Sequence, residues 1–194
     1  MVQNQYSTTT HPLLSWLQGA IAGFIGTIPM TVFMLTTQRF LPHGQRYALP
    51  PEIITQELAH RAHVRHHMNK QAVLAATLVS HLGYGATMGM LYTPVARKLP
   101  LPASLKGILF GLLVWAGSYL GLLPLLGMWE SAYVEPSRRN LMMIAAHVVW
   151  GASTGVAASV LMGKQAATTT QTQNPPAYTR VVPFPQRATP GVLA

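Results

Sequence analysis

The sequence predicts an all-α integral membrane protein in which a four-helix bundle crosses the bilayer. Charged residues make up only 9% of the chain and hydrophobic residues 49%. The few charged residues also leave four long uncharged windows. A soluble domain carries about 25% charged residues, because its surface must remain in water. Charge is therefore too scarce here to cover a soluble globule.

The four predicted spans are approximately 13–36, 72–93, 107–129 and 141–162, and none contains Asp, Glu, Lys or Arg. A helix needs about 20 residues to cross hydrocarbon about 30 Å thick, and each window is long enough. Helices are required because unpaired backbone groups are costly in lipid, and the windows lack the two-residue alternation of barrel strands. The first window has no basic start and is too long for a signal peptide, so we interpret it as a span.

Two polar ends and three connections make up the rest of the chain. Residues 1–12 form a polar lead and residues 163–194 form a tail rich in Thr, Gln and Pro, and both are predicted to be disordered. The four-span domain is thus predicted to cover 13–162. The connections 94–106 and 130–140 are short, so successive spans should be antiparallel neighbours.

The first connection, 37–71, is long and is predicted to contain an interfacial amphipathic helix at about 51–68. It opens with prolines and a glutamate, which favour the first turn of a helix. Its apolar strip consists of Ile53, Ile54, Leu58 and Ala62. The remaining faces carry His60, Arg61, His63, Arg65 and His67. This pattern is typical of a helix that lies in the membrane interface.

The formal net charge is +9. We interpret it as the charge of basic loops that face the anionic headgroups of the bilayer. No nucleic acid is expected as a partner, because no recognition motif accompanies the charge. The loops 37–71 and 130–140 carry more Lys and Arg close to the spans than the opposite side does, so the positive-inside rule predicts both termini outside.

The absence of cysteine excludes disulfides, iron–sulfur clusters and thiolate metal sites.

An internal repeat is the most specific pattern in the sequence. Span two contains the segment 81–89 and span four the segment 147–155, and both fit H-x-x-[YW]-G-A-[ST]-x-G. The matching residues are His81, Tyr84, Gly85 and Gly89 in the first segment and His147, Trp150, Gly151 and Gly155 in the second. Spans one and three each begin with a GxxxG pair, Gly19 with Gly23 and Gly107 with Gly111. We interpret this as two tandem two-helix repeats related by an axis along the membrane normal.

Helical periodicity places the histidine and both glycines of each segment on one stripe, because they are four residues apart. Small residues let helix backbones approach closely, and this close packing is what draws helices together in lipid. The stripes are therefore predicted to be helix–helix contacts. Both His81 and His147 should face protein and not lipid.

Three interpretations of His81 and His147 remain open. Each ring could simply hydrogen-bond a neighbouring helix. The pair could instead mark a route for protons or a small solute, because ionisable residues inside a membrane often do so. As a third possibility, two histidines on parallel helices with nearby glycines could ligate a haem.

A further candidate site lies in the predicted interfacial helix. His60, His63 and His67 recur at i, i+3 and i+7 beside Glu57, close to the spacing with which one helix binds a divalent metal. The alternative is a strip facing headgroups, and the interleaved basic residues would repel a cation. We therefore keep the metal site as the weaker hypothesis.

The sequence contains no nucleophile elbow, no phosphate-binding loop and no acidic residue within a predicted span, so we expect no enzyme. The leading hypothesis is a structural, assembly-related or stress-related membrane protein whose bundle is fixed by His81 and His147, with no cofactor. The alternative is a small proton or solute transporter or channel that uses the same two histidines. Homo-oligomers would then be expected, because one four-helix bundle has little room for a pore. The lipid bilayer is the expected partner in both cases.

The chain also resembles the YagU-like group of small bacterial inner-membrane proteins of unknown function. The resemblance covers about 13–162 and consists of the Gly19-Ala-Ile-Ala-Gly23 start of span one, Leu49-Pro50-Pro51 in the first connection, and the His–aromatic–Gly segments. It implies a bacterial inner (plasma) membrane location and provides no catalytic or binding residues. Part of that group is linked to acid tolerance, which favours a pH-responsive interpretation of the histidines.

Overall fold

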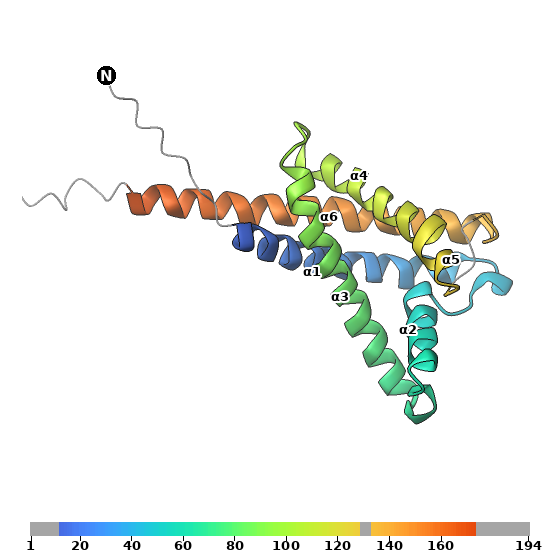
Figure 1. Ribbon diagram of the computed structural model, residues 1–194. Helices are drawn as coiled ribbons and strands as arrows, with labels where there is room; N and C mark the ends of the chain where they lie inside the picture. The colour runs from blue at the N-terminus through green and yellow to red at the C-terminus, as the bar shows by residue number, and fades with distance from the viewer. Residues whose placement is uncertain (1–11, 129–132, 174–194) are drawn as a thin grey trace, which may run out of the picture. The chain divides into compact units, whose positions relative to one another are not determined.

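The computed structural model describes residues 12–128 and 133–173, and every regular element in that part of the chain is helical (Figure 1). The long helices are α1 (Pro12–Thr37), α2 (Pro50–Arg61), α3 (Lys70–Ala96), α4 (Ala103–Ala116) and α6 (Ser137–Gln173). A π-helical segment, Gly117–Leu122, and the short helix α5 (Leu123–Leu125) follow α4. Short 3-10 turns lie at Gln38–Phe40, His43–Gln45 and Arg65–His67.

The predicted disordered ends lie largely outside the described residues. Residues 1–11 and 174–194 are not described, whereas α6 continues as a helix into the predicted tail as far as Gln173. By its internal contacts the chain divides into two units, Met1–Met162 and Gly163–Ala194. All packing described below belongs to the first unit.

Three helices are long and apolar enough to cross a membrane: Leu13–Phe40, Ala103–Leu125 and Ser137–Gly163. They coincide with the first, third and fourth predicted spans. The predicted second span, 72–93, lies within α3, a helix of 27 residues. Although α3 is long enough, it is not among the three, because small and polar residues such as Ser80, His81 and Thr87 lower its hydropathy.

Helices α1 and α3 are in backbone contact at glycines. A side chain on Gly19 would collide with the Gly89 backbone and the Thr93 side chain, and one on Gly23 would collide with the Gly85 carbonyl. Positions early in α1 therefore meet positions late in α3, which makes the two helices antiparallel. This close approach is possible only because no Cβ stands between the backbones.

The same kind of contact joins α4 to α6. A Cβ on Gly107 would collide with the Gly151 backbone, and one on Gly111 would collide with the carbonyl of His147. Gly155 lies equally close to the Ala103 backbone. These helices are also antiparallel, so both GxxxG pairs of the sequence are used as backbone contacts.

Helices α1 and α6 join the two glycine-packed pairs. A Cβ on Gly26 would collide with the Thr154 hydroxyl, and the indole Nε1 of Trp150 lies 3.2 Å from the Gly23 carbonyl oxygen. The Gln18 side chain also donates to the Leu161 carbonyl at 3.2 Å. The start of α1 thus lies beside the last turns of the predicted fourth span.

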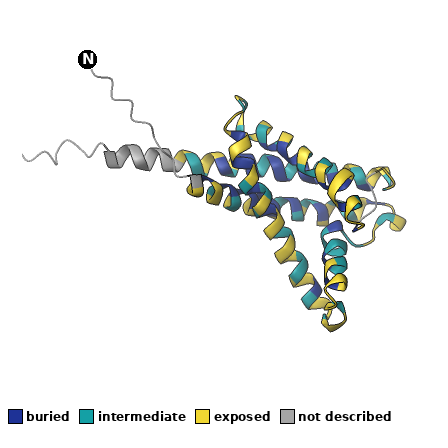
Figure 2. Cartoon of the chain, viewed as in Figure 1, coloured by how far each residue is buried: buried dark blue, intermediate teal, exposed yellow. Residues whose placement is uncertain are grey.

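Exposed residues lie along the outer faces of the long helices (Figure 2), and many of them are large and apolar. More than half of the surface is exposed at Leu17, Val32, Leu113 and Leu141. Hydroxyl side chains are buried instead, including Thr27, Thr93 and Thr154. A soluble protein shows the opposite distribution, so this arrangement is the one expected when lipid is the solvent.

The predicted helix 51–68 is wrong at its carboxyl end, because α2 stops at Arg61. His63 has a left-handed backbone with φ 58°, the amide of Val64 donates to the Ala59 carbonyl at 3.0 Å, and the amide of His63 donates to the His60 carbonyl at 2.9 Å. These bonds form a Schellman motif, which satisfies the last carbonyls of a helix. Glycine usually marks such an end, and its absence explains why the sequence did not reveal it.

The early end of α2 removes the premise of the predicted metal site. His60 lies in α2, His63 in the left-handed cap and His67 in the following 3-10 turn, so the three no longer share one helix face. Among the described residues, no group of three His, Cys, Asp or Glu side chains could hold a metal ion.

Candidate functional site

A cavity of about 300 Å³ lies between α1, α2, α3, the π-helical segment and α6. Nearly all of its surface is apolar. The polar side chains on its wall are Thr27, Thr55, Ser80, His81, Tyr84, Ser118, Tyr119 and His147, and none of them carries a formal charge when histidine is neutral. Cavities of this size and composition are typical of sites for small molecules.

Both segments of the sequence repeat contribute to this one cavity. His81, Tyr84 and Gly85 line it from α3, and His147 and Trp150 line it from α6. The other predicted residues of the repeat, Gly89, Gly151 and Gly155, lie in the helix contacts described above. In these two segments the glycines thus pack the helices, and the histidines and aromatic rings form part of the cavity wall.

His147 is buried, with 6% of its surface exposed. Its Nδ1 lies 2.8 Å from the Met143 carbonyl oxygen, and its ring meets the Tyr119 ring edge-on at a centroid distance of 5.9 Å. Because a carbonyl can only accept, Nδ1 carries the proton and donates. In the neutral ring the other nitrogen, Nε2, is then an acceptor.

His81 is partly buried and has a similar arrangement. Its Nδ1 lies 3.5 Å from Thr31 Oγ1, at the outer limit of a hydrogen bond. The Thr31 hydroxyl already donates to the Thr27 carbonyl at 2.8 Å, so Thr31 accepts from Nδ1 of His81. The Nε2 atom of His81 is therefore also an acceptor.

The aromatic residues of the two repeat segments make different hydrogen bonds. Trp150 is buried, and its indole N–H donates to the Gly23 carbonyl and to Thr27 Oγ1, both at 3.2 Å. Tyr84 is 39% exposed, and its hydroxyl pairs with Ser118 Oγ at 2.8 Å. Both polar ends are thus satisfied within the protein.

The π-helical segment supplies the wall opposite α1. It directly precedes Pro124, whose ring clashes with the carbonyl four residues earlier in a regular α-helix and which has no N–H to donate. Widening the turns accommodates this proline and places the neighbours Ser118 and Tyr119 both on the cavity. Single π-helical turns occur frequently at functional sites.

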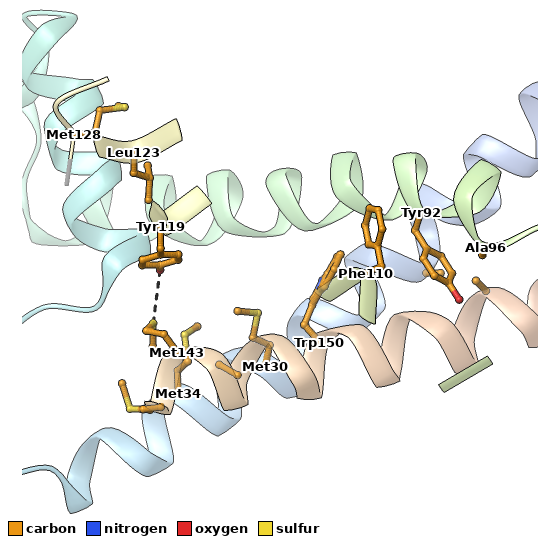
Figure 3. Packing of buried hydrophobic residues seen from close by; sticks show 14 of the residues in the cluster. Met30, Met34, Tyr92, Ala96, Phe110, Tyr119, Leu123, Met128, Met143 and Trp150 are labelled. Atoms are coloured by element: carbon orange, nitrogen blue, oxygen red, sulfur yellow. Dashed lines mark hydrogen bonds between the residues drawn. The ribbon is translucent and has the colours of Figure 1, made fainter. Parts of the chain in front are cut away.

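Figure 3 shows the apolar part of this region. The Tyr119 side chain points from the π-helical segment toward Met143 of α6, and its hydroxyl lies 3.7 Å from the Met143 sulfur. Met30 and Met34 of α1 approach from the opposite side. The π-helical segment was not predicted from the sequence, in which Pro124 indicated only an interruption of the regular helix.

Helix α2 forms a further side of the cavity, which remains partly open because its lining residues Leu58, Leu122 and Leu126 are exposed. Pro51, Ile54 and Leu58 recur at helical spacing and line the wall. Thr55 is 2.8 Å from Ser80 of α3, and Arg61 donates to the carbonyls of Leu126 and Gly127 at 2.9 and 3.0 Å. Half of the apolar strip that predicted an interfacial helix, Ile54 and Leu58, is thus part of the cavity wall.

Arg139, at the start of α6, is a structural residue, whereas the sequence pattern predicted only a positively charged loop there. Its side chain is 1% exposed and its guanidinium donates to the carbonyls of Gln45, Tyr47 and Ala48 at 3.2, 3.2 and 2.6 Å. The guanidinium carbon also lies 3.7 Å from the centre of the Tyr47 ring. The signal for this role was an acidic residue, Glu135, four positions earlier.

Glu135 compensates the buried charge of Arg139. Its carboxylate lies 3.4 Å from Arg139 Nε, as an ion pair without hydrogen-bond geometry, and accepts from the Tyr47 hydroxyl at 2.9 Å. The cluster attaches the loop before α2 to the start of α6. It therefore holds the two predicted positive loops, 37–71 and 130–140, at the same end of the helices.

The fold and the site define an all-helical protein with three helices able to cross a membrane and an apolar cavity between its helices. A family model described as "Protein of unknown function (DUF1440)" matches residues 37–156. The chain therefore belongs to the DUF1440 family, and the match includes both cavity histidines and Arg139. No curated protein and no solved structure matches the chain.

Proposed function

We propose that this chain is an integral membrane protein that binds a small uncharged molecule in the cavity between its helices, as a solute carrier does. The observation that carries the proposal is that His81 and His147, from the two repeat segments, line the same cavity of about 300 Å³. A purely structural bundle gains stability by filling such space, because protein interiors are close-packed and cavities are costly.

This proposal favours the transporter alternative over the leading structural hypothesis. A route for protons would need water or a chain of titratable groups, whereas this wall is nearly all apolar. A molecule that is itself mainly apolar and uncharged suits it better. The glycine contacts would then provide the rigid frame around the binding site.

The proposed fold is a four-span bundle of two tandem two-helix repeats, with α3 as the remaining span. Support comes from the pairing of α3 with α1, a helix that is itself long and apolar enough to cross. Support for the repeat comes from the parallel use of glycines in the α1–α3 and α4–α6 pairs. A location in the bacterial inner membrane, with both termini outside, fits this arrangement. Homo-oligomers and the absence of nucleic-acid partners stay predictions.

The haem alternative fits less well. Haem carries carboxylates, which need basic partners when buried, and in the part of the chain that the structure describes no Lys or Arg lines the cavity. The cavity residues also offer no acid–base pair of carboxylates, so we propose a binding role without catalysis.

The proposal can be tested by filling the cavity. Val114, on the cavity wall, is replaced by Phe, and the matched control is Val156→Phe at a position that is 49% exposed on α6. Native mass spectrometry of the purified protein should detect a small uncharged molecule bound to the wild type and to Val156→Phe, and not to Val114→Phe. Equal retention in all three proteins, or none in the wild type, would argue against the binding role.

A further inference from the structure

The chemistry of the cavity wall restricts the molecule that it can hold, if the solute-binding function proposed above is right. Among the described residues, no Asp, Glu, Lys or Arg lines the cavity, so a buried ion would find no counter-charge from them. The nearest described cation on α2, Arg61, is directed to the carbonyls of Leu126 and Gly127. The ligand should therefore carry no charge.

The volume of the cavity, which is partly open, gives an approximate size for the part of the ligand that it holds. An engineered cavity of about 150 Å³ in another protein binds one benzene molecule. The cavity here, at about 300 Å³, is twice as large. A molecule of about two fused rings would fill it.

The side chains on the wall favour an aromatic ligand. Four methionines contribute, namely Met30, Met34, Met88 and Met128. Thioether sulfurs make favourable contacts with aromatic rings, and their flexible chains adapt to a ligand's outline. The rings of Tyr119 and Trp150 add surfaces for edge-to-face packing.

The hydrogen-bonding capacity of the wall requires a donor on the ligand. The Nδ1 atoms of His81 and His147 donate to Thr31 and Met143, which leaves the Nε2 atom of each ring as an acceptor. The hydroxyls of Tyr84 and Ser118 pair with each other. A hydroxyl on the ligand would satisfy a histidine acceptor that a hydrocarbon would leave unpaired.

We infer that the cavity binds an uncharged hydroxylated aromatic molecule of about two rings, whose hydroxyl donates to Nε2 of His147 or His81. The apolar ring system would pack against the methionines, and the two histidines would select for the hydroxyl. This assigns the repeated histidines to ligand recognition.

The test measures saturable binding of 2-naphthol to the full-length protein in detergent. Two comparison ligands each change one property: 2-methoxynaphthalene lacks the donor, and 2-naphthoate is charged. We expect 2-methoxynaphthalene to bind roughly tenfold more weakly than 2-naphthol, the difference expected for one hydrogen bond. Binding of 2-naphthoate should be undetectable. Equal affinities of 2-naphthol and 2-methoxynaphthalene, or tighter binding of 2-naphthoate, would overturn the inference.

Substitutions of the two histidines test whether they accept the hydrogen bond from the ligand's hydroxyl. His147→Phe or His81→Phe should lower the affinity for 2-naphthol roughly tenfold and leave that for 2-methoxynaphthalene unchanged. Because His147 is buried and its loss could unfold the protein, the less buried His81 provides the second variant. Unchanged 2-naphthol affinity in both folded variants would contradict the assignment.

The two proposals fail in different ways. If 2-naphthol does not bind but native mass spectrometry detects another uncharged molecule that Val114→Phe excludes, the ligand class is wrong and the binding function stands. If neither is observed, both are wrong.

Discussion

The two repeat segments, 81–89 and 147–155, share a sequence pattern but lie in different surroundings. In the second segment His147 and Trp150 are 6% and 3% exposed, whereas in the first Tyr84 is 39% exposed and His81 is only partly buried. The glycine contacts also differ by one helical turn, because Gly111 meets the His147 carbonyl while its counterpart Gly23 meets the carbonyl of Gly85. The same motif thus lines one cavity from both helices, with its histidine and aromatic residue more deeply buried in the second segment than in the first.

The difference arises from what precedes each segment. Eight residues before His147 stands Arg139, which attaches the start of α6 to the loop before α2. Eight residues before His81 stands Val73, and the first half of α3 packs instead beside α2 (Figure 1). The comparison teaches that a helix held at its start can bury the histidine and the aromatic residue of its segment more deeply. Beside the other segment, α2 forms part of the cavity wall.

The largest expected effect comes from removing the anchor of the second segment. Arg139→Leu should lower the free energy of unfolding by about 3–5 kcal/mol, because it removes the cation paired with Glu135 and leaves the carbonyls of Gln45 and Ala48 without its donors. Arg138→Leu, at the exposed neighbouring position, is the matched control and should have little effect. Thermal unfolding of both variants in detergent provides the measurement. A small effect of Arg139→Leu would mean that the burial of His147 does not depend on this cluster.

A smaller effect is expected from adding a methyl group to each glycine stripe. Gly151→Ala would collide with the backbone of Gly107. It should lower the free energy of unfolding by about 2–3 kcal/mol, which is the upper range for overpacking. Gly85→Ala would collide with the buried Thr27 hydroxyl, which donates to the Gly23 carbonyl and accepts from Trp150, and should lower the free energy of unfolding by about 1–2 kcal/mol.

Gly83→Ala provides the control for both glycine variants, because nothing lies within 4 Å of a Cβ there. It should be neutral or slightly stabilising, since alanine is the better helix former. The same detergent unfolding assay ranks the three variants. Equal losses for Gly151→Ala and Gly85→Ala would show that the two stripes are packed alike.

The smallest effect concerns the aromatic residue of each segment. Trp150→Phe removes an indole N–H that donates to Gly23 and Thr27. It should lower the free energy of unfolding by about 1 kcal/mol for the hydrogen bonds, and somewhat more because the smaller ring leaves a void. Tyr84→Phe removes a partly exposed hydroxyl bond to Ser118 and should cost about 0.5 kcal/mol. A larger loss for Tyr84→Phe would reverse the proposed order of burial.

The sequence predicted the helical class and three of the spans as helices able to cross, because charge scarcity and long apolar windows are visible residue by residue. It also predicted that the glycine stripes would be helix contacts. The end of α2 at Arg61 was missed because His63, and not glycine, adopts the left-handed cap. The π-helical segment was missed because the local period alone does not show where a proline will widen a turn.

The sequence by itself determined which faces must pack, since small residues four apart on an apolar helix leave the backbone accessible to another helix. Only the tertiary structure decided that both histidines line one cavity and that α2 forms part of its wall. It also decided that Arg139 is buried among loop carbonyls. The physical reason is that cavities and buried charges depend on which distant segments meet, and spacing along one helix does not specify its partner.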